Sequence, residues 1–140
     1  PGGENGFFIE PTIFADVTND MKIAQEEIFG PVLSVIRYDT VEEVIEMAND
    51  TIYGLASGVW TKDVNKAYDI ARKIKAGVVW INDWHMLRND APFGGYKQSG
   101  IGREMGIHSL DEYTQLKHVH TSMVHDVKQR RSFGILFPEG

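Results

Sequence analysis

The spacing of apolar residues along the chain changes several times, and each change predicts a different element. Residues 31–38 (PVLSVIRY) form a β-branched run behind Gly30, which is typical of a largely buried strand. Residues 55–60 (LASGVW) and 78–81 (VVWI) have the same character. The pattern therefore predicts three strands.

Between these strands, apolar positions recur at helical spacing. Thr40 precedes Glu43 by three positions, which is the spacing of a capping box and predicts a helix over about 41–49. Thr61 and Asp63 can begin a second helix before the third strand. Helical crossovers of this length join parallel strands, so we expect an α/β fold, a parallel sheet with crossover helices.

The alternation of strands and helices ends after residue 82. Residues 82–106 are rich in glycine and show no period, which predicts a long, structured loop. Residues 113–121 (YTQLKHVHT) are typical of an isolated strand. Three regions follow from this pattern: 1–106, 107–121 and a tail of uncertain order, 122–140.

The composition argues against several classes of function. The chain has 140 residues and a net charge of −6, whereas nucleic-acid binding proteins concentrate Lys and Arg. It has no apolar run near the ~20 residues that span a membrane, so we expect no membrane contact. It has no cysteine, which excludes a disulfide scaffold, a thiolate metal site and a cysteine nucleophile within the chain. The lack of cysteine is compatible with the cytoplasmic location that we expect.

Two motifs that suggest ligands are better explained without them. Gly100, Gly102 and Gly106 depart from the G-x-G-x-x-G spacing and follow polar residues, which favours a tight loop over a phosphate-binding loop. His118 and His120 would share one face of a strand, but no third ligand is near them in the sequence. We therefore expect no metal site.

Glu26 and Glu27 are adjacent carboxylates that run into an apolar pair. One carboxylate can accept hydrogen bonds from two vicinal hydroxyls, as on a ribose, and the ring of Phe29 can pack on a planar base. The alternative is a helix face whose carboxylates are solvated. Spacing alone leaves both interpretations open.

Several longer motifs, taken together, resemble one family. They are FFIEPTIF (7–14), EEIFGPV (26–32), YGLASGVWTKD (53–63), GVVWIN (77–82), PFGGYKQSG (92–100) and GRE (102–104). In this order they closely resemble the C-terminal part of the NAD(P)-dependent aldehyde dehydrogenases, over residues 6 to about 121. The resemblance implies that residues 1–106 end a catalytic domain and that residues 107–121 are an oligomerisation arm with a protruding β-strand.

The resemblance also implies roles at the cofactor. Glu27 matches the residue that binds the nicotinamide-ribose hydroxyls of NAD or NADP, and Phe29 matches the residue that packs beside the nicotinamide. Glu104 matches a residue that can join a proton path with an upstream lysine, with a salt bridge as the alternative role. Arg103 is expected at an interface, and Gln115 stands where relatives often carry glutamate.

Four residues are implied at the aldehyde pocket. Phe93 matches an aromatic residue of that pocket. Leu87 matches a second position, where several relatives carry an aromatic residue, so a wider or less aromatic pocket is expected. Trp84 and His85 lie on the same loop and are expected at the pocket entrance.

In this family a cysteine thiolate attacks the aldehyde, NAD(P) takes up the hydride, and a glutamate base helps to hydrolyse the thioester to a carboxylic acid. Both of those residues lie upstream of the matched segment. We therefore expect a C-terminal fragment that is inactive by itself and that forms a homo-oligomer through strand 113–121. The alternative is a truncated, non-catalytic assembly or interaction module.

Overall fold

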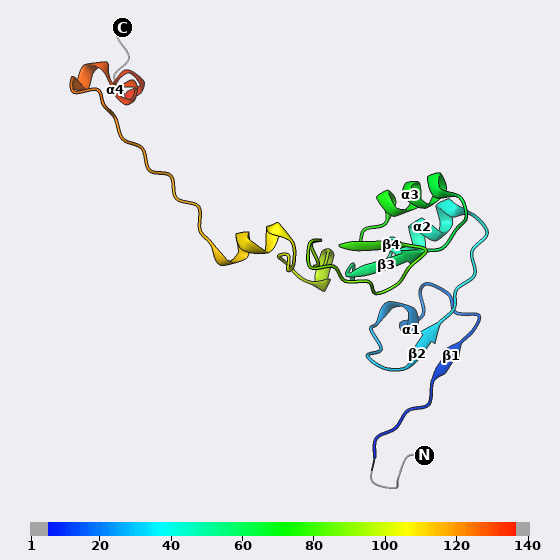
Figure 1. Cartoon of the computed structure of the whole chain (residues 1–140). Helices are drawn as coiled ribbons and strands as arrows, with labels where there is room; N and C mark the ends of the chain where they lie inside the picture. Colours follow the sequence, from blue (N-terminus) through cyan, green and yellow to red (C-terminus); the bar gives the residue numbers. More distant parts are fainter. Residues whose placement is uncertain (1–5, 137–140) are drawn as a thin grey trace.

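The computed structural model describes residues 6–136, which form two small parallel sheets with helices and a C-terminal extension (Figure 1). Residues 1–5 and 137–140, which begin the first region and end the last region expected from the sequence, lie outside the described residues. No helix among the residues described has the length and apolar character needed to cross a membrane.

The first sheet is smaller than the sequence predicts. Strand β1 (Thr12–Phe14) pairs in parallel with β2 (Val32–Ser34), and helix α1 (Lys22–Gln25) lies in the connection. A strand over 31–38 was expected, but the ladder ends soon after β2 because β1 has only three residues. The sequence pattern did not predict β1.

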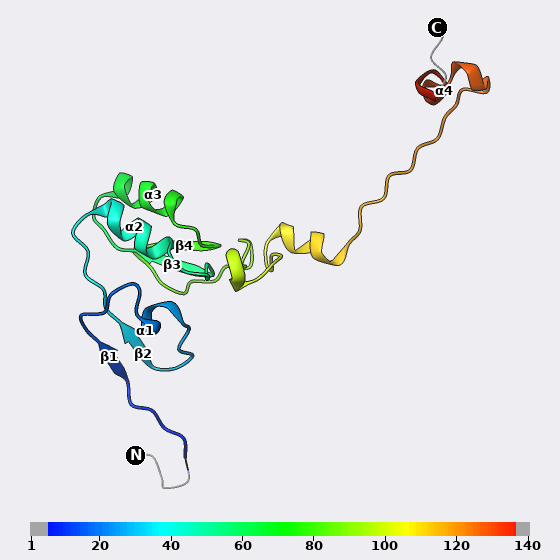
Figure 2. The ribbon, with the colours of Figure 1, turned by 180° about the vertical axis from the view of Figure 1, so that it is seen from behind.

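The second unit follows the predicted order of helix, strand, helix and strand. Its elements are α2 (Val41–Asn49), β3 (Ala56–Val59), α3 (Val64–Lys73) and β4 (Val78–Ile81). Strands β3 and β4 are parallel and hydrogen-bonded, which confirms the crossover. Helix α3 packs against this sheet and α2 lies beside α3, as both views of the ribbon show (Figures 1 and 2).

The expected single sheet of three strands is wrong. Strand β2 pairs with β1, and β3 pairs only with β4, so the described strands form two separate sheets. The physical reason is that a strand pairs with whichever strand lies at hydrogen-bond distance in the folded chain. For β2 that strand is β1, and helix α2 between β2 and β3 does not by itself make those two strands pair.

The glycine-rich loop after β4 is ordered, as predicted. It contains a 3-10 helix, η1 (Lys97–Ser99), and an antiparallel bridge. Backbone bonds tie η1 to the segment before β3: Tyr96 N–H donates to Gly54 O at 2.7 Å and Gln98 N–H donates to Ile52 O at 3.0 Å. The loop therefore has a fixed position relative to the second sheet.

The predicted strand over 113–121 does not form in the single chain. The 3-10 helix η2 (Ile107–Tyr113) occupies its start, and the residues up to 121 have no ladder partner among those described. They run away from both sheets (Figure 1), so no strand edge is within reach. The tail then forms η3 (Val127–Gln129) and α4 (Arg131–Leu136).

The chain has very little core. Among the residues described, Val17 and Ala67 are the only buried hydrophobic side chains. The total exposed area is 12307 Å². A compact protein of this length exposes about 7,300 Å². The isolated chain therefore leaves uncovered an apolar surface that a complete domain would bury.

Candidate functional site

Glu27 and Phe29 lie in the irregular segment between α1 and β2. Glu27 lines an open hollow of about 510 Å³, here called the α1 hollow. Ser57 and Lys75 of the second unit line the same hollow. The ring of Phe29 is 98 % exposed. The carboxylate and the ring are therefore both free to meet a ligand that approaches from outside the chain.

The amide side chain of Gln25 helps to hold α1 in place, as does Ser34 Oγ, which donates to Ile23 O at 3.3 Å. Gln25 Nε2 donates to Asn19 O at 2.6 Å and to Asp50 O at 2.9 Å. Asn19 precedes α1 and Asp50 follows the last residue of α2, so Gln25 joins the segment around the first sheet to the second unit. Sequence reasoning missed Gln25, because its two acceptors are backbone atoms and leave no motif.

Glu26 differs from its neighbour Glu27. Its carboxylate forms an ion pair with Lys22 at 3.5 Å, in which both side chains are more than half exposed. Exposed pairs of this kind contribute little to stability. Glu26, the residue that ends α1, therefore borders the α1 hollow as Glu27 does, but its carboxylate is engaged in a surface ion pair.

Phe93 and Glu104 are brought together by the loop. Phe93 N–H donates to Glu104 O at 2.7 Å, and Glu104 N–H donates to Phe93 O at 2.8 Å. Both residues line the η2 hollow, an open space of about 390 Å³ beside Tyr113. Nothing in the sequence pattern indicated this pairing of two candidate site residues.

Leu87 meets Phe93 at a second opening. Both line the β4 hollow, a space of about 640 Å³ between β4, Tyr68 of α3 and the loop. The loop segment beside Leu87 is closed by Arg88, which donates to the two carboxylate oxygens of Asp90 at 2.9 and 2.7 Å. These bonds hold the pKa of the Asp90 carboxyl below its usual value.

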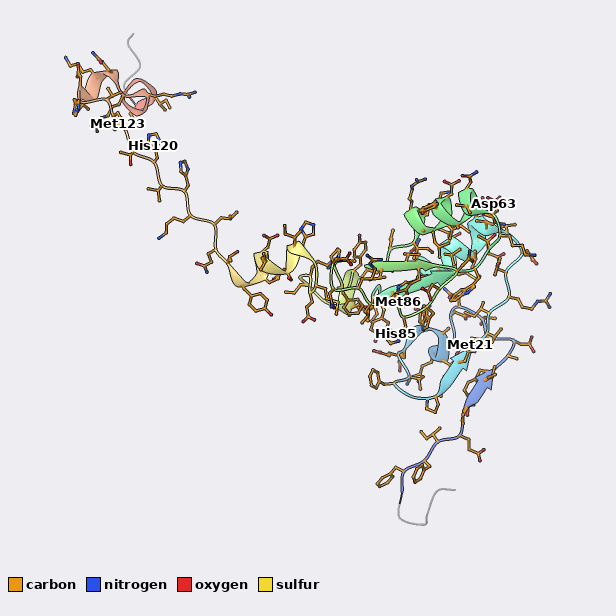
Figure 3. The ribbon with its side chains drawn as sticks, viewed as in Figure 1. Met21, Asp63, His85, Met86, His120 and Met123 are labelled. Carbon is orange, nitrogen blue, oxygen red and sulfur yellow. The ribbon has the colours of Figure 1, made fainter. Side chains whose placement is uncertain are left out.

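Trp84 and His85 belong to an aromatic cluster. The Trp84 ring lies 5.1 Å from Trp80 and 6.4 Å from Trp60, and His85 lies 6.3 Å from Trp80, measured between ring centroids. Figure 3 shows His85 and Met86 on the body of the molecule. Sequence reasoning missed Trp60 and Trp80, although the Val-Trp pair at both strands was a visible signal.

The candidate residues form two groups, and they do not share one cavity. Glu27 lines the α1 hollow, whereas Phe93 borders the β4 and η2 hollows, with Leu87 at the first and Glu104 at the second. No group of three metal-binding side chains occurs within residues 6–136. His118 and His120 face each other edge-on at 6.2 Å, on the extended segment.

Comparison with known proteins gives a consistent family. Residues 1–119 match the family model described as "Aldehyde dehydrogenase family". The betaine aldehyde dehydrogenase of Bacillus subtilis is 58 % identical over 120 residues, which are 86 % of this chain and 24 % of that protein. This chain thus spans about a quarter of the length of such relatives.

Solved structures agree with this match. The NAD+ complex of an aldehyde dehydrogenase from Bacillus cereus has a TM-score of 0.83 and 55 % identity, covering 86 % of this chain and 25 % of that one. The indole-3-acetaldehyde dehydrogenase of P. syringae, in complex with NAD+ and IAA, has a TM-score of 0.77 and 57 % identity, covering 79 % of this chain and 22 % of that one. The chain therefore belongs to the aldehyde dehydrogenase family.

Proposed function

We propose that this chain is the C-terminal quarter of an NAD(P)-dependent aldehyde dehydrogenase that oxidises an aldehyde to a carboxylic acid. The observation that carries the proposal is the match of residues 1–119 to the family, at 58 % identity to a relative of which the match covers 24 %. The absence of cysteine fits this assignment, because a family nucleophile would have to come from the upstream part.

Within the complete enzyme, Glu27 and Phe29 would hold the nicotinamide half of the cofactor. The carboxylate of Glu27 accepts hydrogen bonds from the two ribose hydroxyls, and the exposed ring of Phe29 packs beside the nicotinamide. The bound cofactor supplies the hydride acceptor. The NAD+ complexes of the related structures favour NAD over NADP.

The aldehyde would lie against the loop after β4. Phe93 and Leu87, which border the β4 hollow, supply the apolar wall, and Trp84 with His85 forms the entrance. Glu104, bonded through its backbone to Phe93, would pass a proton toward an upstream lysine, as the resemblance implies.

In the assembled enzyme, residues 113–121 would pair with a sheet of another subunit. The segment extends away from its own sheets and has unpaired backbone groups, which a strand edge of a second copy can satisfy. Residues 1–106 would then complete the catalytic domain, residues 107–121 would form the oligomerisation arm, and the enzyme would act in the cytoplasm. Residues 122–140 lie beyond the family match.

A complementation assay tests the catalytic proposal. The chain is co-expressed with the B. subtilis relative truncated to lack its last quarter, and NADH formation is followed with a betaine aldehyde substrate. We expect activity only when both pieces are present. If the two pieces co-purify as a complex but show no activity, the second candidate is favoured, a non-catalytic assembly module. The absence of cysteine from this chain also supports that candidate.

The pair Glu26 and Glu27 offers a matched control in that assay. Loss of a charged acceptor of hydrogen bonds weakens binding by about 1.5–3 kcal/mol, so Glu27→Gln is expected to raise KM for NAD about tenfold or more. Glu26 borders the same hollow, but its carboxylate is paired with Lys22, and Glu26→Gln is expected to change KM less than twofold. Equal effects of the two substitutions would contradict the role of Glu27.

A further inference from the structure

The guanidinium group of Arg103 spans the loop that carries Phe93 and Glu104. Arg103 Nη1 donates hydrogen bonds to Gly95 O at 3.0 Å and to Gly102 O at 2.6 Å. Its guanidinium carbon lies 5.3 Å from the centroid of the Tyr96 ring, in cation–π contact. The half-buried side chain thus joins the two arms of the loop.

The backbone around Arg103 has room for this side chain and little else. A Cβ on Gly94 would lie 2.6 Å from Gly102 O and 2.9 Å from Cδ of Arg103. Gly102 has a φ of +76°, and a Cβ on it would lie 2.9 Å from a carboxylate oxygen of Glu112. That same oxygen accepts the backbone N–H of Arg103 at 3.3 Å. Glycine at both positions therefore lets the arms close around Arg103.

Arg103 and its two acceptor carbonyls, here called the Arg103 clamp, lie directly beside the bridge between Phe93 and Glu104. Arg103 is covalently next to Glu104, and its acceptor Gly95 is two residues after Phe93. We propose that Arg103 is a positioning residue, which holds Phe93 and Glu104 in register at the candidate pocket. The functional meaning of this clamp rests on the function proposed above, whereas the clamp itself does not.

The chemistry of guanidinium explains why arginine serves here. Its planar group offers several donors in fixed directions while its face rests on an aromatic ring. Both carbonyl acceptors gain a charge-assisted hydrogen bond, which is stronger than a neutral one. Both hydrogen bonds come from Nη1, so what a lysine ammonium lacks is the planar face that lies over the Tyr96 ring. Besides the interface expected for Arg103 from the resemblance, the side chain makes these two hydrogen bonds within its own chain.

Amide hydrogen exchange of the full 140-residue chain tests the proposal. The exchange rates of the Phe93 and Glu104 amides are compared among the unsubstituted chain, Arg103→Met, Arg103→Lys and Arg72→Met. Arg72 is a matched control because its guanidinium also lies over a tyrosine, Tyr68, at 6.0 Å, but on the exposed surface of α3. The Asn82 amide, which donates to Val59 O at 2.8 Å, is the internal reference.

We expect Arg103→Met to accelerate exchange of both bridge amides about tenfold while the reference amide is unchanged. In Arg103→Lys the exchange rates of the bridge amides should lie between those of the unsubstituted chain and those of Arg103→Met. Arg72→Met should leave the exchange rates of the bridge amides unchanged. Unprotected bridge amides in the unsubstituted chain, or an unchanged rate in Arg103→Met, would overturn the proposal. Equal acceleration of the reference amide in both Arg103 variants would also overturn it, because it indicates general stabilisation.

These exchange rates need neither NAD nor aldehyde. If the bridge amides are protected and their protection depends on Arg103, but the complementation assay shows no activity, the proposed function is contradicted and the role of Arg103 is supported. If the complementation assay shows activity, but the exchange rates of the bridge amides do not change on substitution of Arg103, the role of Arg103 is contradicted and the proposed function is supported.

Discussion

Single side chains fix where the two helices of the second unit begin. The Thr40 hydroxyl accepts the N–H of Glu43, whose carboxylate accepts the N–H of Thr40, and the Asp63 carboxylate accepts the N–H of Lys66 at 3.1 Å. Each cap depends on residues three positions apart, which explains why both were predictable from the sequence.

Removal of the Asp63 cap should destabilise α3. Asp63→Ala leaves the Lys66 N–H without its acceptor, and we expect the backbone amides of α3 to lose about 1 kcal/mol of protection, measured by amide hydrogen exchange. Asp69→Ala is the control, because Asp69 forms only an exposed ion pair with Arg72 on the same helix. Its expected effect is below about 0.5 kcal/mol. Similar losses in both variants would show that the cap is not the cause.

At the scale of elements, short segments are held by contacts between remote parts of the chain. The 3-10 helix η1 begins with Lys97, a non-glycine residue with a φ of +52°. Its ammonium donates to Asn49 O at 2.8 Å and to Thr51 O at 3.0 Å, at the carboxyl end of α2. A cation suits this end of a helix, where carbonyl groups lack intrahelical partners.

Replacement of this ammonium should loosen η1. In Lys97→Met the two carbonyls lose a charged donor, and we expect exchange of the Gln98 amide, which donates to Ile52 O, to rise about fivefold, equivalent to about 1 kcal/mol. Lys66→Met, on the exposed surface of α3, should leave that rate unchanged. If Lys97→Met also leaves it unchanged, the backbone bonds alone hold η1.

At the scale of the whole molecule, the uncovered apolar surface dominates. Ile13 and Leu33 are register partners across β1 and β2, so they lie side by side, and they are 68 % and 57 % exposed. A second apolar surface is the extended segment, where Leu116 is fully exposed. His120 and Met123 in Figure 3 mark how far this part of the chain lies from the sheets.

The isolated chain should therefore self-associate with rising concentration, as sedimentation velocity would show. If the first sheet is the main surface of contact, Leu33→Glu should lower the associated fraction at least about threefold, because burial of a carboxylate is costly. Leu116→Glu is the matched variant for the extended segment and separates the two surfaces. A monodisperse, cooperatively unfolding monomer would contradict the expectation.

The candidate site was only partly accessible to sequence reasoning. The motifs identified Glu27, Phe29, Phe93 and Glu104 as candidates by resemblance. They did not indicate that Phe93 and Glu104 form a backbone pair, that Gln25 anchors α1, or that Arg103 closes the loop. These contacts end on backbone carbonyl groups, which every residue carries, so they leave no pattern of residue types.

The sequence by itself determined the elements whose causes are local. Helices α2 and α3, their caps and the parallel crossover between β3 and β4 depend on spacing within about twenty residues. Only the tertiary structure decided how the strands pair. Strand β2 pairs with β1, and residues 113–121 have no strand partner among the residues described. Strand pairing requires a partner at hydrogen-bond distance, and that partner is a property of the folded chain or of another subunit.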